Sequence, residues 1–481
     1  MRSCWQLVDA VTDATRHPAF RRYDLRGRAG SGPEQLSSPF ATALGQALAI
    51  ELGERRRQRF YLGRDQRLTS PALAAALAEG LVSSGCNVVD LGAVPTPMVN
   101  FAIQNDPDCA GGAMVTASHN PPSDNGFKLY FGQAVATAEQ LQRLAQSVQS
   151  ASFSPARGGR LQRGEISARY LDRVVADLTD SAPLRPRHIV IDTANAVAAP
   201  FARQLFERLG MRLTVLNGEV DGHFPGHPPN PADPANLAQL RAAVVAERAE
   251  LGLAFDGDAD RLVAVCGEGN IVWPDRLLML FAQQLLARQP GASVVYDIKC
   301  SQQLAALVAE AGGVAAQCQT GHAFVRRAVA QHQAALAGEF SGHFFFPDRW
   351  YPFDDGLYAG ARLLQLLDQR GCSLQQAVAE LPQSYSSDEI LVPVADSEKF
   401  AVMEQFIAQA RFDSAQINLL DGLRADFAHG WGLVRASNTG PALTLRFEAQ
   451  TSAELNTIQQ QFAQQLRPHL THIDEYLPVC L

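Results

Sequence analysis

The chain has very little lysine and no excess of positive charge. Of its 41 lysine and arginine residues only three are lysines, at positions 128, 299 and 399, and the formal net charge of the 481 residues is −8. This balance, without an extended basic run, predicts no general affinity for nucleic acid or for an anionic membrane. An anion that binds to this protein must therefore bind at a local site.

Paired cysteines and long apolar runs are also missing. The eight cysteines form no CxxC pair and no zinc-finger spacing, which is typical of reduced thiols inside a cell. No stretch reaches 18 uninterrupted apolar residues, and the first 30 residues contain no apolar signal-peptide core. These absences predict a cytoplasmic protein without a membrane anchor. The segment before Phe20 contains no motif to which a role can be assigned.

The length of the chain predicts several domains, because one domain usually contains roughly 100–200 residues. Strand-length apolar runs alternate with amphipathic helix-length segments in three successive blocks, which predicts three similar mixed α/β domains with mostly parallel sheets. The last hundred or so residues change to an α+β pattern. The predicted domains are 1–160, 161–268, 269–378 and 379–481. Predicted strands include 59–63, 112–116, 188–192, 251–255 and 293–297, and predicted helices include 39–52, 200–209, 301–311 and 452–466.

Polar loops that follow predicted strands are the first candidates for a site, because ligands of parallel α/β sheets bind beyond the carboxyl ends of the strands. Residues 116–122, TASHNPP, form such a loop and contain Ser118 beside His119. The pattern predicts an exposed hydroxyl that can act as a nucleophile, and a serine that only caps its own turn is the alternative. A hydrolase dyad is not predicted, because no GxSxG elbow occurs.

A second loop, DGDADR at residues 256–261, predicts a metal site. Asp256, Asp258 and Asp260 occupy every second position of a loop that lies between two apolar runs. Three carboxylates so close together would repel one another unless they bound a hard cation. An EF-hand is excluded, because Arg261 stands where that loop needs glycine. Mg²⁺ fits this ligand set best, Arg261 supplies a fixed charge for an anion, and a solvated acidic turn is the alternative.

Two further loops carry suitable chemistry. In GEFSGH, residues 338–343, an extended backbone would point Glu339, Ser341 and His343 to one face, where they suit sugar hydroxyls and proton transfer. In RASNT, residues 435–439, a guanidinium and three hydrogen-bonding side chains surround a turn, an arrangement that can cradle phosphate. Ordinary surface residues and a plain hairpin turn are the alternatives. No Walker A or GxGxxG segment occurs, so a nucleotide-binding fold is not predicted.

Together with other motifs these loops resemble the α-D-phosphohexomutase family, and most closely its bacterial phosphomannomutase/phosphoglucomutase branch. The resemblance spans nearly the whole chain and implies a central cleft between the four domains. The other motifs that carry it are FRRYDLRG (20–27), GRD (63–65), the extension of the serine loop to Lys128, DGHFPGHPPNP (221–231), YDIKCS (296–301), TGH (320–322), RWYPFDDG (349–356) and GWGLVRASNTGP (430–441).

The resemblance implies a role for each candidate residue. Ser118 would be the phosphorylated nucleophile, and one Mg²⁺ would lie between its phosphate and Asp256, Asp258 and Asp260. The remaining catalytic candidates are Arg26, His119, Lys128, Arg261 and His343. The candidates for binding the sugar or assisting proton transfer are Lys299, His322, Glu339 and Ser341, again with His343. The candidates for holding the phosphate that is not transferring are Tyr23, Arg435, Ser437, Asn438 and Thr439.

The implied reaction is reversible phosphoryl transfer between the 1- and 6-positions of mannose and glucose phosphates, through a hexose 1,6-bisphosphate. GEFS is more similar to the GEMS of that branch than to the GEQS of phosphoglucosamine mutases, which remain the alternative within the family. An aspartyl-phosphate phosphatase is disfavoured, because the segment does not complete the DxDx[TV] motif of those enzymes: its last position would fall on Asp260 or Leu262. A catalytically silent sugar-phosphate-binding protein is the non-enzyme alternative. The expected partners are small hexose phosphates, and the expected state is a monomer.

Overall fold

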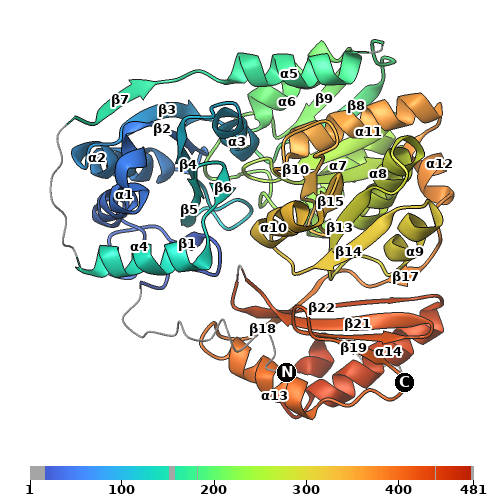
Figure 1. The fold of residues 1–481 in the computed structure, drawn as a ribbon. Coiled ribbons are helices and arrows are strands. Elements are labelled where there is room, and N and C mark those ends of the chain that lie inside the picture. Colours follow the sequence, from blue (N-terminus) through green and yellow to red (C-terminus); the bar gives the residue numbers. More distant parts are fainter. Residues whose placement is uncertain (1–16, 151–157, 181, 439, 478–481) are drawn as a thin grey trace.

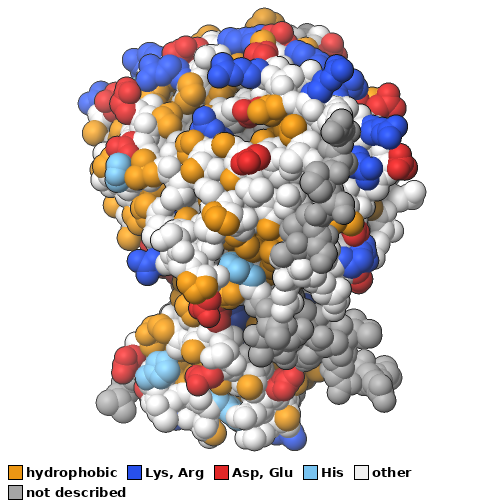
Figure 2. Space-filling view, turned by 90° about the vertical axis from the view of Figure 1, so that its left-hand side faces the viewer, with side chains coloured by type: hydrophobic (Ala, Val, Ile, Leu, Met, Phe, Trp, Pro, Cys, Tyr) orange, Lys and Arg blue, Asp and Glu red, His pale blue; other side chains and the backbone are white. Residues whose placement is uncertain are grey.

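The chain is built around four β-sheets, each followed along the sequence by the next (Figure 1). In this computed structural model the described residues are 17–150, 158–180, 182–438 and 440–477. Predictions that concern residues 1–16, Thr439, Cys4 and Cys480 lie outside them. The sheets and their helices are called the first, second, third and fourth units below. Figure 2 shows that the molecule narrows between the larger body, which contains the first three units, and the fourth.

The first unit has seven strands in the order β1-β5-β4-β2-β3-β7, with β6 beside β5. The strands β4, β2, β3 and β7 run parallel, and β1, β5 and β6 are antiparallel additions. The strands are β1 (Leu25–Arg28), β2 (Arg59–Arg64), β3 (Asn87–Ala93), β4 (Cys109–Val115), β5 (Asp124–Phe131), β6 (Ala134–Val135) and β7 (Arg160–Arg163), and the helices are α1 (Ser38–Leu52), α2 (Ser70–Ser83), α3 (Thr96–Gln104) and α4 (Ala138–Ser150).

The second and third units repeat this plan on a smaller scale. Their sheets have the orders β12-β11-β10-β8-β9 and β14-β13-β15-β16. The strands are β8 (His188–Asp192), β9 (Arg212–Leu216), β10 (Leu251–Phe255), β11 (Leu262–Cys266), β12 (Ile271–Val272), β13 (Ser293–Asp297), β14 (Val314–Cys318), β15 (Leu336–Gly338) and β16 (Phe344–Phe345). The helices are α5 (Ser167–Thr179), α6 (Ala199–Arg208), α7 (Ala238–Ala246), α8 (Pro274–Arg288), α9 (Gln303–Glu310), α10 (His322–His332), α11 (Gly356–Arg370) and α12 (Leu374–Ala379).

One local arrangement occurs in all three of these units. A buried parallel strand ends in a polar loop, and the chain then returns along it as an antiparallel strand: β4 to β5, β10 to β11, and β15 to β16. The three loops so formed contain Ser118, the DGDADR segment and the GEFSGH segment. The strands before them are completely buried, which anchors one end of each loop rigidly.

The fourth unit is an antiparallel sheet of order β17-β22-β21-β20-β19, with β18 also paired to β22. Its strands are β17 (Tyr385–Ser386), β18 (Ile390–Pro393), β19 (Gln416–Asn418), β20 (Leu423–Phe427), β21 (Gly430–Ala436) and β22 (Ala442–Ala449), and its helices are α13 (Lys399–Gln409) and α14 (Ser452–Leu466). Both helices lie on the face of the sheet that points away from the other units (Figure 1). Their apolar side chains pack on that face to form a core of its own.

The second and third units share one continuous apolar core, which also reaches helix α3 of the first unit. Helix α11 of the third unit packs against α5 at the start of the second, and the Tyr170 hydroxyl donates a 2.9 Å hydrogen bond to Asp355 Oδ1 across this contact. The first unit has a further core between α1, α2 and its sheet. The body is therefore joined by a large apolar core, whereas the fourth unit has a separate core and meets the third through a small apolar cluster of Ile298, Trp431 and Leu433.

The predicted fold class is confirmed: the first three units contain mixed, mostly parallel sheets and the fourth is α+β. The predicted strands 188–192, 251–255 and 293–297 have the bounds of β8, β10 and β13. Helices α3, α4, α5, α8, α11 and α12 were not predicted, and neither were the strands β1, β5, β6, β7, β12, β16 and β17. All four residues of β7 are exposed, so this edge strand carries no alternating apolar pattern.

Helices α1 and α2 of the first unit pack closely because each contributes a glycine that faces the backbone of the other helix. A Cβ atom added at Gly80 would lie 2.1 Å from the carbonyl oxygen of Thr42, and one at Gly45 would lie 2.4 Å from that of Leu77. Contacts this short leave no room for a methyl group, so either helix would have to shift.

Gly80→Ala is therefore expected to destabilise the first unit by about 1–3 kcal/mol, because overpacking forces the helices apart. Urea unfolding followed by circular dichroism would measure the change. The control is Glu79→Ala on the exposed face of the same helix turn, for which a change within about 0.5 kcal/mol is expected. An unchanged midpoint for Gly80→Ala would contradict the close packing.

Candidate functional site

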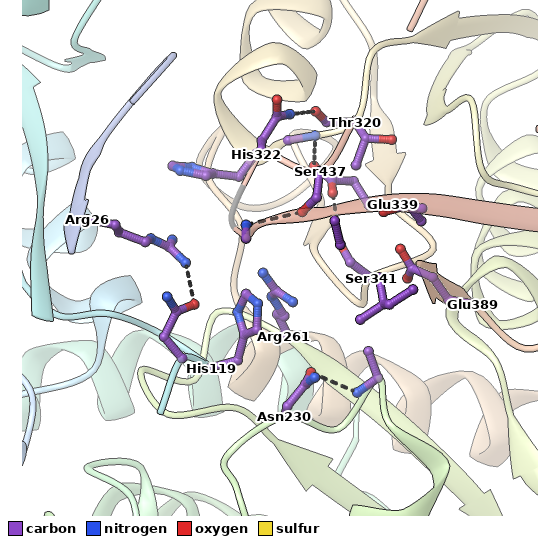
Figure 3. A pocket seen from close by; sticks show the side chains of 18 of the residues that line it. Arg26, His119, Asn230, Arg261, Thr320, His322, Glu339, Ser341, Glu389 and Ser437 are labelled. Atoms are coloured by element: carbon purple, nitrogen blue, oxygen red, sulfur yellow. Dashed lines mark hydrogen bonds between the residues drawn. The ribbon is translucent and has the colours of Figure 1, made fainter. Parts of the chain in front are cut away.

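A cavity of about 460 Å³ lies where the four units meet. Each unit contributes polar side chains to its wall, several of which point toward one another in Figure 3. The lining includes Tyr23, Arg26 and His119 from the first unit, Asn230 and Arg261 from the second, Lys299, His322, Glu339, Ser341 and His343 from the third, and Glu389, Arg435, Ser437 and Asn438 from the fourth. Twelve of these were predicted from the sequence; Asn230 and Glu389 were not.

Ser118 lies in the loop between β4 and β5, with its backbone in the left-handed region at φ 52°. Its hydroxyl donates a 2.7 Å hydrogen bond to Asp256 Oδ2 and lies 3.2 Å from His119 Nδ1. The prediction that this hydroxyl is exposed is wrong, because Ser118 is 0% exposed. The domain that carries the aspartates covers the loop, which the local sequence could not reveal. Ser118 therefore lies behind the cavity wall, against the metal loop.

The predicted metal loop brings three carboxylates together. Oxygen atoms of Asp256, Asp258 and Asp260 all lie within 4.8 Å of one another, and all three side chains are buried. Burial and the charges of the other two aspartates hold the pKa of Asp256 well above its ordinary value. Asp258 Oδ1 and Asp260 Oδ1 are buried without a hydrogen-bond partner among the described residues. Such unpaired oxygens, crowded in one loop, are suitable ligands for a divalent cation.

Lys128 of β5 neutralises part of this cluster. Its ammonium group donates to Asp258 Oδ2 at 2.6 Å and also pairs with Asp260 Oδ2. Although burial opposes the charged form, these two aspartates raise the pKa of Lys128 well above its ordinary value. Lys128 does not line the cavity, so in this conformation it lies with the aspartates behind the wall.

The GEFSGH segment forms a turn, so the condition of an extended backbone, under which the three side chains would share one face, is not met. The backbone N–H of Gly342 donates to Glu339 O at 3.1 Å, and that of Glu339 donates to His343 O at 2.9 Å. Gly342 has φ 100°, a conformation that favours glycine, and this reverses the chain from β15 into β16. The turn still brings Glu339, Ser341 and His343 to the cavity, and Ser341 Oγ donates to Glu339 Oε2 at 2.8 Å.

His343 lies between a guanidinium and two carboxylates. Arg261 Nε donates to its Nε2 at 3.0 Å, while its Nδ1 lies 2.7 Å from Asp354 Oδ2 and 3.6 Å from Asp260 Oδ1. Burial would lower the pKa of this imidazole, but the two carboxylates outweigh it and raise the pKa above its ordinary value. Asp354 lies in the quoted RWYPFDDG motif but was not predicted as a site residue. It fixes the ring from the side opposite the cavity's arginine.

The other two histidines of the cavity are neutral near pH 7. Burial, followed by the charges of Arg261 and Arg26, holds the pKa of His119 well below its ordinary value. Burial likewise lowers the pKa of His322 to about 4. A neutral imidazole can accept a hydrogen bond or a proton from a hydroxyl, which suits both residues to contact with a sugar or with Ser118.

Arg435 of β21 is aimed by a carboxylate that the sequence did not indicate. Its Nε donates to Asp421 Oδ2 at 2.9 Å, and its buried second terminal nitrogen, NH2, has no hydrogen-bond partner among the described residues. The same oxygen of Asp421 accepts from the Thr320 backbone N–H at 3.1 Å, so it also joins the third and fourth units. A lone Asp421 before a strand has no pattern that could have marked it.

Two lysines lie on the side of the fourth unit: Lys299 lines the cavity, and Lys399 lies behind the loop that follows β21. Lys399 Nζ donates to the backbone oxygens of Ser437 and Gly440, at 2.7 and 2.9 Å, and supports the RASNT loop from below. Lys299 Nζ donates to Glu389 Oε1 at 3.2 Å. Like Lys128, both are 3% exposed.

The geometry suits phosphoryl transfer, because a serine hydroxyl contacts a carboxylate cluster that suits a metal, next to a cavity lined by arginines and other polar groups. Within the described ranges, no helix is both long and apolar enough to cross a bilayer.

Four family profiles match consecutive parts of the chain. They are described as phosphoglucomutase/phosphomannomutase alpha/beta/alpha domains I, II and III and the C-terminal domain, and they match residues 17–155, 168–269, 273–385 and 389–465. A phosphomannomutase/phosphoglucomutase of Pseudomonas aeruginosa is 42% identical over 460 residues, 96% of this chain and 97% of that protein. A phosphoglucomutase of Neisseria gonorrhoeae is 44% identical over 457 residues, 94% and 97% of the two chains.

Among solved structures, a phosphoglucomutase/phosphomannomutase family protein from Burkholderia thailandensis has a TM-score of 0.85 and 40% identity, and the match covers 94% of this chain and 97% of that one. The chain therefore belongs to the phosphoglucomutase/phosphomannomutase family. Members of this metal-dependent isomerase family transfer a phosphoryl group between the 1- and 6-positions of hexose phosphates. The family predicted from the motifs is confirmed.

Asp421→Asn is expected to raise the KM for a hexose phosphate about tenfold with little change in kcat. The variant keeps the shape but removes the charge that aims Arg435, and a hydrogen bond to a charged group contributes about 1.5–3 kcal/mol. Steady-state kinetics would measure it. Asp426→Asn is the matched control, because Asp426 also pairs with an arginine. That arginine, Arg424, does not line the cavity, whereas Arg435 does. Equal KM values for both variants would contradict this role.

Proposed function

We propose that this chain interconverts the 1- and 6-phosphates of mannose and glucose, with phosphorylated Ser118 as donor and a hexose 1,6-bisphosphate as intermediate. The observation that carries the proposal is the 2.7 Å contact between the Ser118 hydroxyl and Asp256, directly behind a cavity lined by all four units. A donor phosphate on this oxygen would lie between the carboxylate loop and the cationic wall. The names of the relatives from Pseudomonas and Neisseria supply the substrates.

The groups near Ser118 suit a transition state whose charge is spread over phosphoryl oxygens. Mg²⁺ would be held by a phosphate oxygen on Ser118 and by Asp256, Asp258 and Asp260, and when bound it neutralises charge on the transferring group. Arg26 and Arg261 line the cavity beside it and supply fixed positive charge. Lys128 balances the aspartates from behind the wall, and His119 lies within hydrogen-bond distance of the hydroxyl.

Proton transfer to and from the sugar hydroxyl is assigned to His343. Asp354 orients its ring and favours a proton on it, while its cavity side faces Arg261. Glu339 and Ser341 would bind the sugar hydroxyls, because they present a carboxylate and a hydroxyl on one turn. Lys299 and His322 extend the same wall.

The opposite end of the cavity would hold the phosphate that is not transferring. There the NH2 nitrogen of Arg435, which has no hydrogen-bond partner among the described residues, could donate to a phosphate oxygen. Ser437 and Asn438 line the same part of the cavity, on the loop whose backbone oxygens accept from Lys399. Tyr23 lines the same cavity, and Thr439, which lies outside the described residues, is included in this set as a prediction from the sequence. Because phosphate and sugar contacts occupy separate elements, a bisphosphate could turn over between two orientations and meet equivalent groups in each.

Several finer predictions belong to this proposal. The cofactors are one Mg²⁺ and a hexose 1,6-bisphosphate as activator, and the partners are small hexose phosphates without nucleic acid or membrane. A cytoplasmic monomer is expected, because the six described cysteines are free and the site is complete within one chain. The domain division at 160/161, 268/269 and 378/379 is kept as a prediction.

The first experiment follows the conversion of mannose 1-phosphate and glucose 1-phosphate to their 6-phosphates, with Mg²⁺ and a trace of glucose 1,6-bisphosphate. Ser118→Ala is expected to abolish both activities, because no other hydroxyl lies on Asp256 Oδ2 among the described residues. Ser123→Ala, an exposed serine of the same loop, should keep them. Activity on glucosamine phosphate alone would move the enzyme to the neighbouring branch. Full activity of Ser118→Ala would refute the phosphoserine.

Metal removal tests the aspartate loop. Chelation with EDTA is expected to eliminate activity and added Mg²⁺ to restore it, while Asp258→Asn should raise the Mg²⁺ concentration needed for half-maximal rate at least about tenfold, because it removes one of three anionic ligands. Asp108→Asn, an exposed aspartate of the first unit, is the control. A chelated enzyme that remains active would contradict the metal site.

A further inference from the structure

Arg67 lies in the loop after β2, and both terminal nitrogens of its guanidinium group donate to the segment that contains Ser118. The side chain is 0% exposed and does not line the cavity. An arginine has five N–H donors, and five hydrogen bonds account for them. NH2 donates to Ser118 O at 2.8 Å and to Asn120 O at 2.7 Å. NH1 donates to Pro121 O at 2.5 Å and to Asp124 O at 3.1 Å. The fifth donor, Nε, bonds to Asp65 Oδ2 at 3.1 Å.

Asp65 holds the other side of the same loop. Its Oδ2 accepts from Thr116 Oγ1 at 2.7 Å, and Thr116 Oγ1 in turn accepts from the backbone N–H of Ser118 at 2.9 Å. The Asp65–Arg67 pair thus holds the N–H of Ser118 through Thr116 and its carbonyl group directly. Both main-chain groups of the nucleophilic residue are fixed by a single buried ion pair.

This matters because Ser118 has φ 52°, a conformation that is unfavourable for any residue except glycine and persists only where the surrounding structure holds it. The conformation directs the side chain to Asp256. Without the four carbonyl contacts, the loop could relax to an ordinary turn and move the hydroxyl away from the carboxylate loop.

The same arginine also touches the second unit, which carries the aspartates. Its guanidinium carbon lies 5.1 Å from the centre of the Phe224 ring, and the neighbouring Gln66 side chain accepts from the Val197 N–H at 2.8 Å. On the opposite side, a Cβ at Gly257 would lie 2.3 Å from Ser118 O, the oxygen that Arg67 holds. The carbonyl group of Ser118 is therefore in close contact with Gly257 of the metal loop and is hydrogen-bonded to Arg67.

We propose that Arg67 is a positioning residue for phosphoryl transfer: it holds the main chain of Ser118 in the left-handed conformation that aims the hydroxyl at the metal loop. The inference rests on the proposed role of Ser118 as the phosphorylated nucleophile. A lysine at this position keeps the charge but has three donors on one nitrogen, so it cannot span four carbonyl oxygens.

The test compares Arg67→Lys with Arg362→Lys. Arg362 is an equally buried arginine, paired with Asp348 in the third unit, and it does not line the cavity. Each protein is mixed with glucose 1,6-bisphosphate and Mg²⁺, and phosphate on Ser118 is followed by rapid quenching and intact mass. Arg67→Lys is expected to transfer phosphate about 100-fold more slowly, the loss typical of a misplacement of about 1 Å. Its kcat should fall equally, with KM for glucose 1-phosphate within about threefold of wild type.

Arg362→Lys should lower the thermal midpoint to a similar extent yet keep the transfer rate and kcat. A folded Arg67→Lys with wild-type transfer overturns the inference, and so does a loss confined to KM. If Arg67→Lys does not fold, Thr116→Val replaces it, because it cuts the link from Asp65 to the Ser118 N–H without reaching the cavity. The same fall in kcat supports the inference, and an unchanged kcat refutes it. Failure of the wild type to accept phosphate would instead refute the proposed function, and this inference with it.

Discussion

The repulsion among three buried carboxylates is the constraint on which the site depends. Asp256, Asp258 and Asp260 lie on one tight loop, where their charges cannot persist without cations. Arg261 of the same loop compensates part of this charge, and the other compensating groups come from elsewhere in the fold: Lys128 from the first unit and His343 from the third. The units must therefore be assembled before the loop is stable, and the acidic loop itself helps to hold them together.

A strand, a polar loop and an antiparallel return strand, used three times, supply most of the reacting groups. Each loop begins at a buried strand that cannot shift, so its polar residues are presented at a fixed height above the sheet. The three loops differ in length and in the side chains that they carry: a serine beside a histidine, a cluster of three aspartates, and a turn with a carboxylate and a histidine. In the proposed function, this one architecture separates phosphoryl transfer, charge neutralisation and sugar binding.

Much of the site was predictable because its residues occur in dense local motifs that follow apolar strands. Asp421, Glu389 and Asp354 were missed as site residues, since no local pattern indicates that they contact Arg435, Lys299 and His343. The burial of Ser118 was also missed, because the second unit, not the serine loop, determines it. Local pattern indicated the candidate residues of the cavity and of the carboxylate loop, whereas the residues that orient them became visible only through tertiary contacts.

The scarcity of lysine acquires a meaning from the burial of all three residues. Lys128, Lys299 and Lys399 are each 3% exposed, and each is engaged by carboxylates around the cleft. Since the chain has no other lysine, its outer surface offers no ε-amino group and carries its positive charge entirely on arginine. Amine-directed labelling, cross-linking or surface immobilisation would consequently find no side chain to react with while the fold is intact.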